Sequence, residues 1–159
     1  MGNSGGSLTA RSTSTGELHR LMRAAGFTGI DEPRVLAEGW QVTDFAEAGR
    51  RSLANLVQSV GAPAVMVSFL DSDVGFVEAL TPDGDSWEGL LNRERAKSYE
   101  IPLEHFPVES AVAGAIAWSV VAGLTPDAEA VRQTLTGSAL FAEGLSSALL
   151  VALGLPDAA

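Results

Sequence analysis

Four aspartates near the middle of the chain have the spacing closest to a metal-binding pattern. Asp71-Ser-Asp73 and Asp83-Gly-Asp85 each place carboxylates two residues apart, as calcium loops do. Neither fragment continues with the regular acidic spacing and the terminal glutamate of such a loop. Aspartate is also frequent in tight turns, because its side chain bonds to the nearby backbone. We therefore interpret the four as turn residues and predict no metal site.

Glu78 and His105 are the side chains best suited to acid–base chemistry. If Ser72 and Asp73 form the turn of a hairpin, Glu78 lies opposite Val67 on an apolar face. That face also holds Val65, Phe69, Phe76 and Leu80. A carboxylate there needs a basic partner, a proton or contact with water, because burying an unpaired charge is costly. An enzyme using Glu78 or His105 is one alternative, but the sequence has no Gly-x-Ser-x-Gly nucleophile motif. We predict no catalytic residue and no cofactor.

Unbalanced acidity is the strongest feature of the composition. The chain has 159 residues with 10 basic and 20 acidic side chains, a formal net charge of −10. Residues 61–92 contain six acids and no base. Such a charge repels phosphate backbones and attracts basic proteins. We predict no nucleic-acid ligand and a partner with a basic surface.

Trp87 stands among these acids, next to the Asp83–Asp85 turn. An aromatic ring surrounded by carboxylates can anchor a basic protein surface, although it could equally fold back over the hairpin. The predicted partner-binding residues are Asp71, Asp73, Asp83, Asp85, Trp87 and Glu88. We expect a non-catalytic protein-binding domain of the immunity, inhibitor or adaptor kind. A regulatory domain that holds a small molecule, or a domain with only a structural role, is a further alternative.

The absence of cysteine and of long apolar runs excludes several classes of protein. Without cysteine there is no disulfide framework, no thiol nucleophile and no cysteine-ligated metal. The longest apolar stretch, Ala111 to Leu124, is shorter than the ~20 residues that cross a bilayer. The first residues lack the basic and apolar regions of an export signal. We predict a cytoplasmic protein that does not bind membranes.

The first half of the chain mixes helix and strand signals. Residues 1–13, rich in Gly, Ser and Thr, are predicted to be disordered. A capping box, Ser14-Thr-Gly-Glu17, starts a helix that Gly26 ends. We then expect a short strand within 34–42, a helix over 44–60 capped by Asp44 and Glu47, and a β-hairpin over 64–80. A short helix over 85–91 and an edge strand near 99–101 follow.

The second half is predicted to be helical over 108–123, 126–135 and 138–153. Small residues recur at helical spacing in the first of these helices: Ala111, Ala115, Ser119 and Gly123. This strip permits close helix packing within the chain, a homodimer surface, or a cavity for a small ligand. The expected fold class is α+β, with a small antiparallel sheet built on the central hairpin (about 64–80) and packed by helices. We expect a single domain over 14–159, with its helical part at 108–155.

Overall fold

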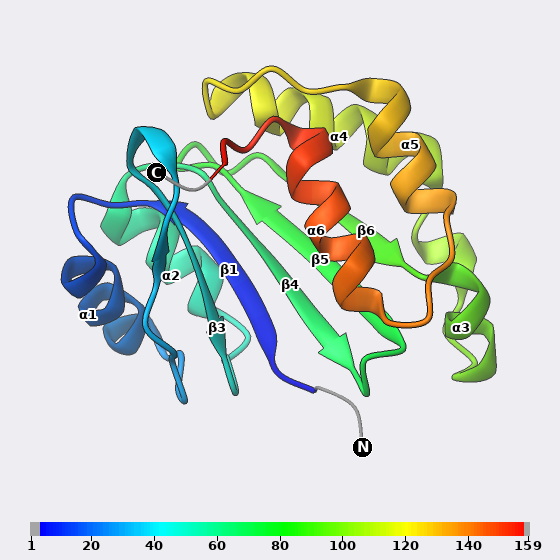
Figure 1. Cartoon of the computed structure of the whole chain (residues 1–159), viewed down its shortest axis with the longest axis horizontal. Coiled ribbons are helices and arrows are strands. Elements are labelled where there is room, and N and C mark those ends of the chain that lie inside the picture. The colour runs from blue at the N-terminus through cyan, green and yellow to red at the C-terminus, as the bar shows by residue number, and fades with distance from the viewer. Residues whose placement is uncertain (1–3, 158–159) are drawn as a thin grey trace.

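A six-stranded antiparallel sheet with helices on both sides forms the protein, according to a computed structural model that describes residues 4–157 (Figure 1). The strand order is β2-β3-β1-β4-β5-β6. The strands are β1 (Gly6–Arg11), β2 (Arg34–Val35), β3 (Trp40–Phe45), β4 (Ala64–Leu70), β5 (Val74–Leu80) and β6 (Ser86–Leu91). The predicted α+β class, the central hairpin and the helical second half are confirmed.

The two faces of the sheet are covered by different helices, and we name each face after the first helix on it. The α1 face carries α1 (Thr15–Ala25) and α2 (Ser52–Val60). The α4 face carries α4 (Val108–Val121), α5 (Ala128–Thr136) and α6 (Ala142–Leu153). Figure 1 shows these two groups of helices on opposite sides of the strands. Each face therefore has its own apolar core.

The N-terminal segment lies inside the sheet, between β3 and β4. Leu8 and Ala10 point to the α1 face and are fully buried there. The prediction of disorder over 1–13 is therefore wrong for residues 6–11, and residues 1–3 lie outside the described part. Strand pairing on both sides supplies the burial that this Gly-, Ser- and Thr-rich composition lacks by itself. A side chain at Gly6 would overlap the ring of Phe45, so the small residue permits the close strand pairing.

The predicted helix over 44–60 is two elements in the structure. Its first residues, Asp44 and Phe45, end strand β3, while α2 begins only at Ser52. The Asp44–Glu47 spacing is thus not a helix cap, and the short strand expected within 34–42 is the β2–β3 pair. The predicted α1 is confirmed, because Ser14 Oγ accepts a hydrogen bond from the Glu17 amide and Gly26 ends the helix.

The register of the β4–β5 hairpin differs by one residue from the prediction. Asp71 and Ser72 adopt left-handed backbone conformations, and the Asp73 amide donates to the Leu70 carbonyl. Glu78 therefore pairs with Met66 and not with Val67. A shift of one residue moves a side chain to the other face of the sheet. Glu78 consequently lies on the α1 face, while Val67 lies on the α4 face.

The predicted helix over 85–91 is the edge strand β6. Trp87 and Leu91 belong to the core of the α4 face, whereas Leu90 packs with the small cluster on the other face. This alternation is typical of a strand, and it outweighs the capping pattern of Asp85 and Glu88. The expected edge strand near 99–101 is also wrong, because these residues follow α3 (Arg93–Ser98) and pair with no strand.

The three C-terminal helices are confirmed, but their small residues are not a dimer surface. Ala111, Ala115 and Ser119 are at most 4% exposed, and the two alanines pack in the core of the α4 face. Only Gly123 of the predicted strip is exposed, so the homodimer predicted through these residues is not available. Within residues 4–157, no helix is long and apolar enough to cross a membrane.

Candidate functional site

The six predicted partner-binding residues do not form one surface. Asp71 and Asp73 lie in the turn between β4 and β5, whereas Asp83 and Asp85 lie at the opposite end of β5, in the turn before β6. Trp87 is only 5% exposed, since its ring packs into the core of the α4 face. Trp87 is therefore not an exposed anchor. Glu88 points to the α1 face, toward the groove described in the next paragraph.

A part of the α1 face forms a groove beside the segment that follows α3. The cavity here is about 300 Å³. Its residues come from three adjacent strands and from that segment, and we call it the acidic groove: Met66, Ser68, Phe76, Glu78, Glu88 and Phe106. A second cavity of about 450 Å³ shares Met66, Ser68 and Glu78 and continues to Arg50 and the loop before α2. The two cavities are therefore neighbours on the same face of the sheet.

Strand pairing determines how the groove residues are arranged. Met66, Glu78 and Glu88 are register partners across β4, β5 and β6, so they form one row. Phe76 lies two residues along β5 on the same face, and its ring packs against Phe106 with centroids 6.2 Å apart. The sequence identified Glu78 and Glu88 but placed Glu78 on the wrong face. It gave no signal for Phe106, which reaches the sheet through the tertiary fold.

The two glutamates of the groove carry like charges at directly opposed positions. Opposed residues on neighbouring antiparallel strands have Cβ atoms roughly 4.5–5.5 Å apart, so two carboxylates there repel each other. Partial burial, followed by the charge of Glu88, raises the pKa of Glu78 above its ordinary value. Within the described residues, no basic side chain forms an ion pair with either glutamate.

The carboxylate at the β4–β5 turn, by contrast, is compensated. Arg95 Nη1 donates to Asp73 Oδ1 at 3.0 Å, and the Tyr99 hydroxyl donates to Oδ2 at 2.5 Å. Hydrogen bonding to Asp73 raises the pKa of Tyr99. This end of the hairpin is therefore a weaker candidate for attracting a basic partner.

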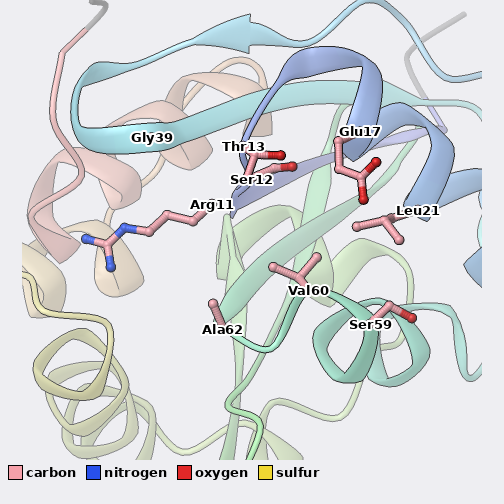
Figure 2. Close-up of a pocket in the computed structure, with 9 residues that line it drawn as sticks. All are labelled: Arg11, Ser12, Thr13, Glu17, Leu21, Gly39, Ser59, Val60 and Ala62. Carbon is pink, nitrogen blue, oxygen red and sulfur yellow. The ribbon is translucent and has the colours of Figure 1, made fainter.

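Another cavity, of about 360 Å³, lies where β1 meets the start of α1 and the end of α2 (Figure 2). Figure 2 shows the Arg11 side chain extending away from Glu17 and Leu21. The Arg11 guanidinium lies 4.7 Å from the ring centroid of Trp40, and Glu17 is paired with Arg20. The charged groups that line this cavity therefore already have partners, which makes the cavity a weaker candidate than the acidic groove.

Possible metal ligands and His105 are the remaining side chains that the sequence analysis considered for chemistry. Among residues 4–157 there is no group of three or more His, Asp or Glu side chains positioned to hold a metal ion. His105 is exposed in a 3₁₀ turn (Leu103–His105). Comparisons with protein-family models, with curated proteins and with solved structures gave no match.

Proposed function

We propose that the chain is a non-catalytic binding domain for a protein with a basic surface, and that a lysine or arginine of this partner enters the acidic groove. The observation that supports this most is the opposed pair Glu78 and Glu88, because no basic side chain in the described part of the chain forms an ion pair with either of them. A cation between the two carboxylates would convert repulsion into attraction.

The like-charge pair has a cost that binding would explain. Opposed like charges destabilise an antiparallel sheet, typically by a few tenths of a kcal/mol up to about 1 kcal/mol. Partial burial of Glu78 adds to the cost, as the raised pKa indicates. Residues that reduce stability without a structural benefit are frequent at functional sites. The pair thus fits a surface adapted to a ligand better than one adapted to the isolated fold.

The shape and the apolar floor of the groove also suit a long basic side chain. Lysine and arginine carry an apolar stem that can lie on hydrophobic surface while the charged end reaches a carboxylate. Met66, Phe76 and Phe106 offer such a surface beside the two glutamates. Aromatic rings add attraction for a cation that lies over them. The groove therefore combines both requirements within one cavity.

The test uses a fluorescein-labelled peptide of alternating glycine and lysine, with binding measured by fluorescence polarisation. Glu88→Lys replaces one groove carboxylate by a cation, so we expect roughly tenfold weaker binding, about 1.4 kcal/mol. Glu32→Lys makes the same charge change on an exposed loop before β2, the strand at the opposite edge of the sheet from β6. We expect this control to change affinity less than about twofold.

Equal weakening by both variants would show attraction to the overall charge alone and would contradict the groove. Binding that does not weaken with added salt would also contradict it, because exposed carboxylates are screened by salt. Far-UV circular dichroism of Glu88→Lys checks that the fold is retained. Glu88→Gln, which removes the charge without adding a new one, should weaken binding by an intermediate factor.

A further inference from the structure

Beyond its first turn, helix α4 has no charged residue on any side, which is unusual for a helix at the surface. No charged residue occurs between Glu109 and Asp127. One side of the helix, with Ala115 and Trp118, packs on the sheet. A surface helix normally has a polar outer side, whereas a helix that is apolar all round is normally buried.

The outer side of α4 is exposed and still apolar. It carries Ala113, Ala117, Val120 and Val121, at the i, i+4, i+7 and i+8 positions of one helical face. Val120 is 62% exposed and Val121 is 54% exposed. Contiguous apolar surface of this kind typically marks a protein interface.

A hollow adjoins this outer side at the C-terminal end of the helix. It has a volume of about 300 Å³ and lies between α4 and the β5–β6 turn. Its walls contain two tryptophans and small residues, and we call it the α4 hollow: Thr81, Asp85, Ser86, Trp87, Gly114, Ala117, Trp118 and Val121. A side chain at Gly114 would overlap Trp87, so glycine permits the close approach of α4 to β6. The hollow has the size of one or two large side chains.

The charges beside the α4 hollow indicate what kind of partner would occupy it. Asp85 lies at the hollow, Asp83 lies in the same turn, and both are exposed. Neither forms an ion pair with a base of the described chain. An apolar depression beside unpaired carboxylates complements an apolar side chain next to a lysine or arginine.

We infer that the α4 hollow is a second contact for the basic partner, and that it receives an apolar side chain flanked by basic residues. This inference rests on the proposed function, because it assigns the same partner. A second copy of the chain suits the hollow less well, since two chains of net charge −10 repel each other. The partner thus contacts both sides of the β5–β6 hairpin.

The experiment follows amide NMR signals of the ¹⁵N-labelled chain during titration with two peptides. One is acetyl-Gly-Lys-Leu-Lys-Gly-amide, and the other has glycine in place of leucine. We expect the leucine peptide to shift the signals of Ala117 and Val121 as well as those of Glu78 and Glu88. The peptide without leucine should shift only the glutamate signals.

Two variants test the hollow itself. Ala117→Trp fills it from an exposed position and should weaken the response at Val121 more than about tenfold. Ala148→Trp makes the same change at an exposed position of α6 and should leave the response unchanged. Glu78→Lys should reduce the groove response and leave the response at Val121 in place.

The outcomes separate the two proposals. If the glutamates respond but Ala117 and Val121 do not, or if both tryptophan variants behave alike, the second contact is wrong while the groove stands. If the glutamates fail to respond, the proposed function is wrong. If the free chain sediments as a dimer that Ala117→Trp dissociates, a second copy occupies the hollow, and the inference is overturned.

Discussion

Two parts of the β4–β5–β6 meander carry carboxylates, and only one of the two parts provides its carboxylate with a basic partner. At the β4–β5 turn, Asp73 accepts hydrogen bonds from Arg95 and Tyr99, both supplied by α3 and the residue after it. In the middle of the β5–β6 ladder, Glu78 and Glu88 face each other and no described base pairs with them. A run of acids in the sequence therefore does not show which carboxylates stay uncompensated.

The difference comes from where the next helix packs. Asn92 lies between β6 and α3 and bonds to the Asp73 carbonyl, so α3 begins beside the β4–β5 turn and Arg95 reaches Asp73 there. The opposite end of the hairpin, with Asp83 and Asp85, lies away from α3. The turn near α3 is thus a structural junction, and the rest of the hairpin is left as a charged surface.

The largest effect is expected at the junction, from Asn92→Ala. Asn92 is fully buried in a left-handed conformation, and its Nδ2 donates to the carbonyls of Asp73 and Ala139. Alanine would leave these carbonyls without their side-chain donor and would add the cost of a left-handed backbone. We expect the free energy of unfolding to fall by about 3 kcal/mol, measured by urea denaturation.

Asn92→Gly separates the two causes, because glycine tolerates the left-handed backbone but makes no side-chain hydrogen bond. It should cost roughly 1 kcal/mol less than alanine. If both variants unfold at the wild-type urea concentration, Asn92 does not hold the junction together, and the contrast between the two regions loses its structural explanation.

The sequence predicted those elements whose signals are local. The Ser14 capping box, the stop at Gly26 and the three C-terminal helices depend on spacing within a few residues, and they are confirmed. Strand β1 was missed because Leu8 and Ala10 are buried only by partners supplied from β3 and β4. The helix predicted over 85–91 was wrong because a capping pattern also fits a strand that begins after a turn.

The candidate site could be predicted only in part. Glu88 was identified by the excess of acids and Glu78 by its place on a predicted apolar face, but the hairpin register behind that placement was wrong by one residue, and nothing in the sequence showed that the two are opposed. The pairing of Asp73 with Arg95 spans 22 residues and depends on how α3 packs. Such contacts have no signature in a single sequence, since nothing local distinguishes a paired carboxylate from a free one.

A smaller effect is expected from Glu78→Gln, which tests whether the opposed carboxylates of Glu78 and Glu88 destabilise the fold. Removing one of two opposed charges should raise the free energy of unfolding at neutral pH by about 0.5 kcal/mol. Thermal denaturation measures the change, and Glu32→Gln is the matched control. A loss of stability would mean that Glu78 has a favourable partner, and the contrast with Asp73 would be wrong.

The pH dependence of Glu78→Gln has a definite sign. Because the pKa of Glu78 is raised in the folded state, its carboxyl group binds a proton more tightly in the native chain than in the unfolded chain. The resulting stabilisation is complete below the ordinary value of 4.5 and is lost as the pH rises through the raised value. Glutamine does not titrate, so the advantage of the variant should grow from acid to neutral pH. A constant difference would contradict a raised pKa.

The smallest effect is a shift in the titration of Tyr99, the single tyrosine of the chain. Its pKa is raised because Asp73 accepts a hydrogen bond from its hydroxyl and repels the phenolate that forms when the proton is lost. Asp73→Asn removes that charge, so the pKa of Tyr99 should fall toward its ordinary value. Ultraviolet absorbance of the phenolate follows this titration directly. Asp83→Asn, in the turn between β5 and β6, should leave the pKa of Tyr99 unchanged.

The raised pKa of Tyr99 also affects stability, because it favours the protonated phenol in the folded state. The free energy of unfolding of the wild type should therefore decrease as the pH rises through this pKa, and Asp73→Asn should make that decrease smaller.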